Sequence, residues 1–253
     1  MVASGKHVVY DVVGTCVSFD AFFEAIDRVL GPRLREHNIT APLLGFAWMS
    51  AAELEHIMLL MSGRDKVPYK EVFKSLFYRV LYMAGIQAPR SFATDEERDL
   101  CQAGYSALEM RPGAREMIEK LRQAGFTVWC LTTGDVARVG GYFQRAGIEM
   151  PRENFVSCHD FMAARRPSQS ALDFQKPSMP SYKAMLEKFS PDDQVWFAAA
   201  HMWDVSAAVK AGFRGAYCSI YEGESCIELF DTDMEVMSDT LPEMADKIIA
   251  ATM

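Results

Sequence analysis

Short runs of apolar residues along this chain end abruptly in polar or charged side chains. The clearest runs lie at residues 7–10, 126–131 and 195–200. Asp11 follows the first run, Thr132 the second, and His201 the third. A short, continuous apolar run is typical of a buried strand in a parallel sheet. We therefore expect three strands of one sheet, each ending in a polar loop.

Helical periodicity occupies two other parts of the chain. Between residues 18 and 106, apolar positions recur every three or four residues, which predicts helices at 20–34, 43–61 and 69–83. After residue 113 further helices alternate with the strands. They are expected at 114–124, 136–146, 181–189 and 205–211. Alternation of this kind predicts a parallel sheet covered by helices.

This order of elements predicts an α/β protein in two parts. Residues 1–17 and 107–253 form a Rossmann-like core with a parallel sheet, and residues 18–106 form a helical cap inserted after the first strand. The segment 155–175, which contains His159, Arg165 and Arg166, is expected to be a solvated loop that can bring an arginine to an anionic substrate. The site is expected in a cleft between the two parts, where water can be excluded.

Four loop positions of the predicted core carry side chains suited to catalysis. Asp11 stands before a turn at Gly14, where a strand presents a carboxylate as a nucleophile. Lys176 precedes Pro177, which blocks helix continuation and keeps the lysine on a loop. The complete set, in chain order, is Asp11, Thr132, Lys176 and Asp204.

This ordered set resembles the four motifs of the haloacid dehalogenase superfamily: a nucleophilic Asp, a Ser or Thr, a Lys and a terminal acid. The match covers nearly the whole chain, and Asp-x-x-Gly-Thr, Lys-Pro and Trp-Asp are most similar to the type II 2-haloacid dehalogenases. The resemblance implies a hydrolase with a capped Rossmann-like core. It also implies a covalent Asp11 ester formed on a small organic acid, and no metal or other cofactor.

The resemblance assigns roles to individual residues, and each has a plainer alternative. Lys176 keeps Asp11 ionised and oriented, or is a surface lysine. Thr15, Thr132 and Thr133 donate hydrogen bonds to the nucleophile or the substrate, or cap strand ends. Tyr182 lies near the substrate, or is a packed aromatic ring. These alternatives remain open at the level of sequence.

The residue two positions after the nucleophile separates two kinds of chemistry. Phosphatases of this superfamily usually carry a second Asp there to protonate the leaving oxygen, but this chain has Val13. Halide leaves without a proton, so Val13 is compatible with carbon–halogen cleavage and unfavourable for phosphoryl transfer. A Mg²⁺-dependent phosphatase, with Asp11, the Val13 carbonyl and Asp204 around the ion, is the first alternative. A relative with lost or altered catalysis, in a binding or biosynthetic role, is the second.

Other positions depart from the dehalogenase pattern. His201 stands where those enzymes commonly have Asn, and Ala199 replaces a Ser. With Asp204 predicted to orient Lys176 and the hydrolytic water, His201 either acts as a base for ester hydrolysis or hydrogen-bonds across the loop.

The predicted cap departs further. Trp48 is expected at the substrate site, but the Arg that precedes this Trp in the dehalogenases is absent. Arg33 or Arg35 is the candidate replacement.

Charge and composition narrow the class of partner. The net charge is −8 and the pI about 5.2, which argues against nucleic acid and leaves a small molecule as the expected partner. Six scattered cysteines without a Cys-x-x-Cys pair predict free thiols in a reducing compartment. The first strand leaves no room for a signal peptide, and no apolar run approaching a membrane span is expected. A cytoplasmic protein is predicted, with a homodimer as one option for its assembly.

Overall fold

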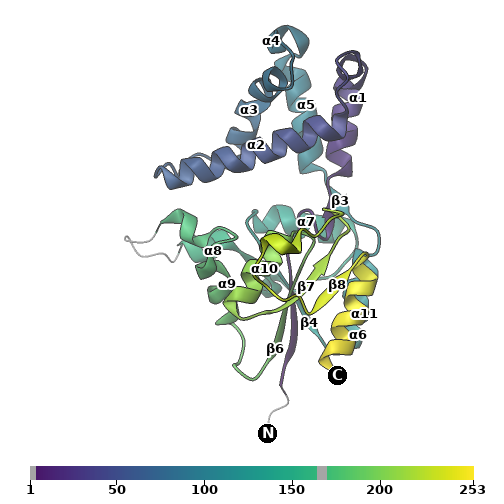
Figure 1. The fold of residues 1–253 in the computed structure, drawn as a ribbon, viewed down its shortest axis with the longest axis vertical. Coiled ribbons are helices and arrows are strands. Elements are labelled where there is room, and N and C mark those ends of the chain that lie inside the picture. The colour runs from purple at the N-terminus through teal and green to yellow at the C-terminus, as the bar shows by residue number, and fades with distance from the viewer. Residues whose placement is uncertain (1–3, 164–169) are drawn as a thin grey trace. The chain divides into compact units, whose positions relative to one another are not determined.

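The computed structural model describes residues 4–163 and 170–253 of the chain (Figure 1). The chain divides into two compact units. The core unit consists of Met1–Ser18, Met110–Gln169 and Asp173–Met253, and the helical unit of Phe19–Glu109 and Ser170–Leu172. Strands β2 (Val17–Ser18) and β3 (Glu109–Met110) pair as a two-stranded sheet where the chain leaves the core unit and returns to it.

A six-stranded parallel sheet forms the centre of the core unit, in the order β5-β4-β1-β6-β7-β8. Its strands are β1 (Lys6–Tyr10), β4 (Thr127–Thr132), β5 (Phe155–Ser157), β6 (Gln194–Ala199), β7 (Arg214–Cys218) and β8 (Val236–Ser238). The central strand β1 pairs with β4 on one side and β6 on the other, with Tyr10 opposite Cys130 and Ala198. The predicted α/β class with a parallel sheet is therefore confirmed.

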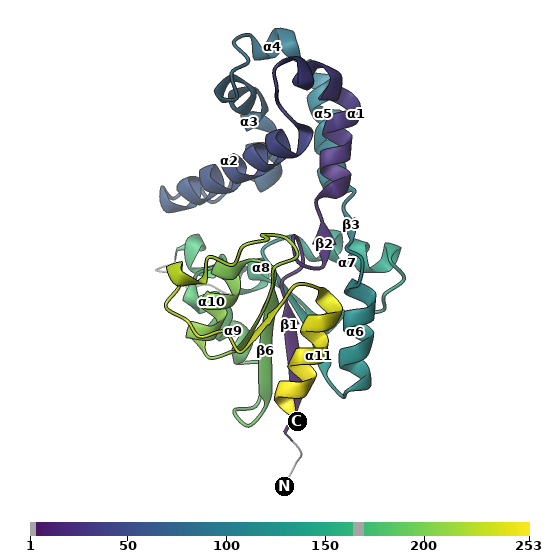
Figure 2. The ribbon, with the colours of Figure 1, turned by 45° about the vertical axis from the view of Figure 1, so that its right-hand side comes forward.

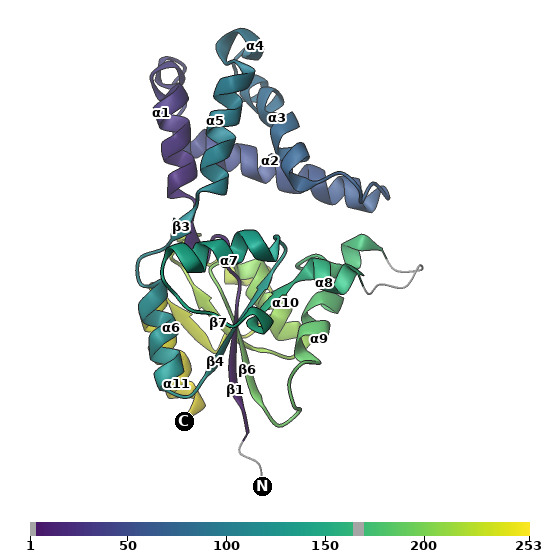
Figure 3. The ribbon, with the colours of Figure 1, turned by 180° about the vertical axis from the view of Figure 1, so that it is seen from behind.

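Helices cover both faces of this sheet. Helices α6 and α11 lie side by side on one face, while α9 and α10 lie together on the other (Figures 2 and 3). The helices of the core unit are α6 (Ala114–Gln123), α7 (Val136–Arg145), α8 (Cys158–Ala163), α9 (Met179–Leu186), α10 (Met202–Ala211) and α11 (Leu241–Thr252). Phe197 of β6 and Val205 of α10 belong to the buried cluster beneath α9 and α10. This packing fixes the starts of α9 and α10 at the carboxyl edge of the sheet.

The helical unit contains α1 (Asp20–Glu36), α2 (Ala41–Met61), α3 (Tyr69–Met83), α4 (Pro89–Phe92) and α5 (Asp95–Ser106). Thr40 caps α2 by accepting from Leu43 N, and Thr94 forms a capping box with Glu97 at α5. Helix α1 packs along α5, and α2 packs against α3 (Figure 3). The interior is aromatic. Its rings are Phe22, Trp48, Phe73, Phe77 and Tyr105.

Two expectations about local structure were wrong. Segment 155–175 was predicted to be a loop, but its described part contains β5, α8 and a 3₁₀ turn at Ala171–Phe174. Strand β5 is only three residues long, too short for an alternation of apolar and polar residues to be recognised in the sequence. Arg165 and Arg166 lie outside the described residues, and His159 is exposed on α8.

The second error concerns apolar runs. Helix α2 is 21 residues long and is apolar enough, by length and composition, to cross a membrane. Glu53 and Glu55 interrupt the apolar run, but the mean hydropathy of the stretch stays high enough for a membrane-spanning helix. In the protein 33% of its most apolar stretch is buried, and core helices meet the same criteria. Its exposed large apolar side chains are Leu43, Phe46, Leu54, Ile57, Met58 and Met61.

Candidate active site

Asp11 follows β1, the strand at the centre of the sheet. Its backbone N–H donates to Ala198 O at 3.1 Å, which continues the pairing of β1 with β6 beyond the last strand residue. The chain then turns tightly, because Gly14 N donates to Val17 O and Val17 N donates to Val12 O. Gly14 has a φ of +94°, in the region that favours glycine. The turn holds Asp11, a residue that is 7% exposed, at the carboxyl edge of the sheet.

The Lys176 ammonium lies between two carboxylates. Lys176 Nζ donates to Asp11 Oδ1 at 2.7 Å and to Asp204 Oδ2 at 2.6 Å. The side chains of all three residues are at most 9% exposed. Charges buried this deeply persist only when paired, and here one cation serves two anions from distant parts of the chain. The structure thus brings together three of the four predicted motif residues.

The remaining oxygens of both carboxylates are also occupied. Thr15 Oγ1 donates to Asp11 Oδ2 at 2.8 Å and accepts from Ala200 N at 2.9 Å. Tyr182 OH donates to Asp204 Oδ1 at 2.5 Å. Asp204 has no exposed surface, so both of its oxygens are committed to protein donors. Its carboxylate therefore holds Lys176 and Tyr182 in place, and solvent does not reach it in this arrangement.

The pKa values of the two carboxylates are shifted in opposite directions. Burial alone would raise the pKa of Asp11, but Lys176 and His201 hold it below its ordinary value. Burial and the charge of Asp11 raise the pKa of Asp204, despite the nearby ammonium. Burial alone would lower the pKa of Lys176, but the two carboxylates raise it above its ordinary value. Asp11 is thus the more acidic carboxylate and is kept in its nucleophilic form.

His201 borders the nucleophile directly. Its Nδ1 lies 3.4 Å from Asp11 Oδ2, and its ring packs against the rings of Trp203 and Tyr221. The side chain is 14% exposed. Burial would lower the pKa of His201, but the carboxylates of Asp11 and Asp204 raise it above its ordinary value. The protonation state of the His201 imidazole therefore depends on the charge of Asp11.

The other predicted site residues lie in different surroundings. Thr132 ends β4, beside β1, and its Oγ1 accepts from Gly134 N at 3.0 Å. Thr133 is exposed on the turn that follows. The ring of Tyr182 is fully buried against Phe197, so this tyrosine contacts Asp204 from within the core. The positions of Thr132 and Thr133 are compatible with both interpretations given above, capping of a strand end and contact with substrate.

Trp48 has a packing role inside the helical unit. It has no exposed surface, stacks on Phe73 with 4.3 Å between ring centroids, and donates its indole N–H to Phe73 O at 2.6 Å. This burial does not fit the predicted contact with substrate. The side chain faces the interior because the apolar face of α2 that carries it also carries Leu44 and Ala52, both buried.

The two arginines considered as replacements for the missing cap Arg have protein partners. Arg33 donates to Phe92 O and to Glu97 Oε1, both at 2.5 Å. Arg35 donates to Asp27 Oδ1 at 2.7 Å. Neither guanidinium is therefore available in this arrangement to bind an anion without breaking an ion pair.

Two residues that sequence reasoning missed hold the site in shape. Arg111 donates to Gly14 O at 2.9 Å and to Thr15 O at 3.3 Å, which clamps the loop after the nucleophile. Glu222 accepts from Met202 N at 2.9 Å and thereby caps α10, the helix that carries Asp204. Both contacts join a side chain to a distant backbone group, and no sequence motif marks them.

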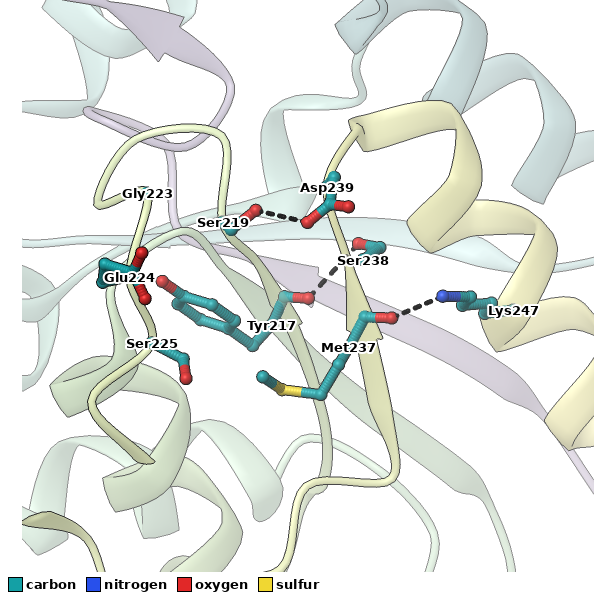
Figure 4. A pocket seen from close by; sticks show the side chains of 9 residues that line it. All are labelled: Tyr217, Ser219, Gly223, Glu224, Ser225, Met237, Ser238, Asp239 and Lys247. Atoms are coloured by element: carbon teal, nitrogen blue, oxygen red, sulfur yellow. Dashed lines mark hydrogen bonds between the residues drawn. The ribbon is translucent and has the colours of Figure 1, made fainter. Parts of the chain in front are cut away.

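A cavity of about 340 Å³ opens near the carboxyl ends of β7 and β8 (Figure 4). Its walls are hydrogen-bonded to one another: Ser219 Oγ donates to Asp239, Ser238 Oγ to Tyr217 O, and Lys247 Nζ to Met237 O. The cavity contains none of the predicted site residues. It is a surface feature separate from the Asp11 cluster.

The donor set at Asp11 does not fit a magnesium ion. The Lys176 ammonium occupies the place between Asp11 and Asp204 where a cation would bridge them. Val13 contributes no carboxylate, and no cluster of three or more His, Cys, Asp or Glu residues suited to a metal occurs within the described ranges. Mg²⁺ needs an octahedral shell of oxygens, part of which water can supply, and here the Lys176 ammonium already neutralises the two carboxylates that would hold it.

Comparison with known proteins assigns the sequence to a family. The model of the haloacid dehalogenase-like hydrolases matches residues 6–212. The sequence has no match among curated proteins.

Solved structures with a similar fold include an L-2-haloacid dehalogenase (TM-score 0.74, 14% identity, 97% of this chain and 99% of that chain). Another is the L-2-haloacid dehalogenase from Xanthobacter autotrophicus (TM-score 0.68, 17% identity, 98% of this chain and 99% of that chain). At these identities the likeness shows the fold. The family model spans most of the sequence and includes Asp11, Lys176 and Asp204, so the predicted superfamily is confirmed and the chain belongs to the haloacid dehalogenase-like hydrolases.

Proposed function

We propose that this hydrolase displaces halide from a small 2-halogenated organic acid through a covalent ester on Asp11, without a metal ion. The observation that carries the proposal is the position of Lys176 Nζ, 2.7 Å from Asp11 Oδ1. The ammonium keeps the carboxylate ionised and occupies the place of a bridging metal. The names of two of the similar structures, both L-2-haloacid dehalogenases, support the same chemistry.

The first step needs a charged, oriented nucleophile and little else. One Asp11 oxygen attacks the carbon that carries the halogen, a C–O bond forms, and halide leaves with the electron pair of the broken bond. Lys176 and Thr15 each hold one oxygen, so the carboxylate cannot rotate away from its line of attack. Val13 supplies no proton, and a halide leaving group needs none.

The second step is hydrolysis of the ester. Water adds to the Asp11 carboxyl carbon, the hydroxy acid leaves, and the free carboxylate is restored. We propose a small-molecule substrate and no cofactor for both steps. The magnesium phosphatase alternative receives no support from the donor set described above, since Lys176 stands between the two acids it would need.

The test compares two substrate classes with and without chelator. Purified protein is incubated with each enantiomer of 2-chloropropionate and, separately, with p-nitrophenyl phosphate, in the presence of EDTA or of Mg²⁺. The expected result is halide release that EDTA leaves unchanged, with a transient mass increase on the peptide that contains Asp11. Phosphate release that requires Mg²⁺, without halide release, would replace the proposal by the phosphatase alternative.

A further inference from the structure

The residues around Asp11 leave one candidate for activating the hydrolytic water. Both oxygens of Asp204 accept hydrogen bonds from Lys176 and Tyr182, and the side chain has no exposed surface. Lys176 is protonated between two carboxylates and has no lone pair to offer. Thr15 donates to Asp11 and accepts from Ala200 N, so its hydroxyl is engaged on both sides.

His201 has the geometry that these groups lack. Its Nδ1 lies 3.4 Å from Asp11 Oδ2 and, within the described part of the chain, makes no hydrogen bond of normal geometry. Trp203 and Tyr221 flank the ring, with centroids 5.5 and 4.9 Å away. The start of α10, where His201 lies, is held by the contact between Met202 N and Glu222. Nδ1 is itself buried in this arrangement, so water must enter beside the Asp11 carboxyl carbon before this nitrogen can act on it.

We propose that His201 is the general base of ester hydrolysis, and that Asp11 itself decides when His201 can act. The inference rests on the proposed function, because it concerns the second half of that reaction. In the free enzyme the Asp11 carboxylate faces the imidazole and favours its protonated form. Once Asp11 is esterified its charge is gone, and the imidazole releases its proton to solvent at the stage at which a base is needed.

The charged groups around His201 support this change of state. Burial would lower the pKa of His201, the charge of Asp11 and the more distant Asp204 raise it, and Lys176 lowers it. Trp203 and Tyr221 contribute uncharged rings. Esterification removes the carboxylate that lies nearest to Nδ1, while the burial and the Lys176 ammonium remain. The pKa of His201 must therefore fall when the intermediate forms.

The proton balance of the cycle closes without a further reagent. His201 takes a proton from water as its oxygen bonds to the Asp11 carboxyl carbon. The tetrahedral species collapses, the bond to the hydroxy acid oxygen breaks, and that oxygen receives the proton from His201. The proton on the regenerated Asp11 carboxylic acid returns to His201, which restores the starting ion pair. The net products are the hydroxy acid, halide and one proton.

The experiment separates the two half-reactions. Wild type, His201→Asn and His201→Gln are mixed with 2-chloropropionate in a rapid-quench instrument, and halide release and the mass of the Asp11 peptide are followed. We expect halide release from all three proteins, because the first step needs no base, and a burst of one halide per active site in the two variants, where the second step is slow. Hydrolysis of the ester should then be about 10²- to 10⁴-fold slower in the variants, so the esterified peptide accumulates.

The pH profile provides a readout that a structural role would not change. The rate constant of ester hydrolysis in wild type should rise with pH through one ionisation, whereas that of His201→Asn should lack this ionisation. His159→Asn, the same substitution at an exposed histidine of α8, is the matched control and should keep the wild-type profile.

Each outcome of this experiment has a distinct meaning. Halide release followed by equally fast hydrolysis in His201→Asn would overturn the role of His201 and leave the proposed function intact. Absence of any halide release from wild type would overturn the proposed function itself. If the variants lost the burst as well as the hydrolysis, His201 would act in the first step, and the proposal would be wrong in its assignment.

Discussion

The core unit and the helical unit use their buried polar groups in opposite ways. At the carboxyl edge of the core sheet, Asp11, Lys176 and Asp204 bury three charges in one connected network. The helical unit buries an aromatic cluster, and the indole N–H of Trp48 is satisfied by a backbone carbonyl. The first arrangement is costly for stability and suited to chemistry, whereas the second is suited to packing alone.

This contrast shows which part of the family pattern the chain retains. The core motifs are present in sequence and, for Asp11, Lys176 and Asp204, in contact. The helical unit lacks the expected Arg before Trp48, and Arg33 and Arg35 form ion pairs within that unit. The residues of the proposed reaction thus lie in the core unit, and the helical unit lacks the arginine that the family pattern places before Trp48.

The largest expected effect is at the nucleophile. Asp11→Asn keeps the shape of the side chain but removes the attacking charge, so halide release should fall ~10³-fold or more. Circular dichroism should show the same fold as wild type. Retention of most of the activity would remove Asp11 from the mechanism and with it the distinction drawn between the two units.

Removal of the shared cation should damage both activity and stability. Lys176→Met leaves two carboxylates buried and facing each other, which should lower the free energy of unfolding by about 3–5 kcal/mol. Urea denaturation measures this change, and Lys183→Met on the neighbouring helix α9 is the matched control. A loss below about 1 kcal/mol would mean that water enters the cluster and screens the two acids.

In the helical unit the expected effect is on stability alone. Trp48→Ala removes a fully buried ring and should lower the free energy of unfolding of that unit by about 3–5 kcal/mol. Trp48→Phe should keep most of the packing and leave the KM unchanged. A KM that rises with Trp48→Phe, at unchanged stability, would instead give this side chain a role in substrate binding.

Acid should weaken the core cluster in a predictable direction. The pKa of Asp11 in the folded protein lies below its ordinary 3.8, because Lys176 and His201 outweigh the effect of burial. A depressed pKa contributes stability above the ordinary value, and this contribution is lost as the pH falls further. The difference in unfolding free energy between wild type and Asp11→Asn should therefore be constant near neutrality and shrink below about pH 4. A difference independent of pH down to 3 would contradict the assignment.

The smallest effect is expected at Arg33. Its ion pair with Glu97 is partly exposed, with side chains 37% and 27% accessible, so Arg33→Gln should cost less than about 1 kcal/mol. Activity should be unchanged, because the guanidinium is held within the helical unit. A KM increase specific to Arg33→Gln, absent from Arg35→Gln, would show that Arg33 leaves Glu97 to bind the anion.

Sequence alone predicts the elements whose signal is strong and local. Strands β1, β4 and β6 are runs of five or six residues that end in polar groups, so both the strands and the positions of Asp11 and Thr132 follow from the pattern. Strands β5 and β8 have three residues each, too few for a period to be measured. The elements in segment 155–175, before Lys176, are also short, and this is why the sequence pattern did not predict them.

The contacts that hold the site in shape have no local signal. Arg111 and Gly14 are 97 positions apart, and Glu222 and Met202 are 20 positions apart. Each pair joins a side chain to a backbone group, whose identity a sequence does not record. Trp48 illustrates a related limit: its residue type fits both a substrate contact and a core, and only the packing of α2 shows which surroundings it has.

The clamp made by Arg111 affects how the sequence of the helical unit can change in evolution without disturbing the core unit. Arg111 N donates to Cys16 O, and its guanidinium holds Gly14 and Thr15, so the exit and the return of the chain are tied together inside the core unit. The closure entropy of an inserted segment grows slowly with its length, by about 0.6 kcal/mol for each doubling. An insert of different length or sequence can therefore join at this point at small thermodynamic cost. The nucleophile loop keeps its shape while evolution, or an engineer, exchanges the helical insert.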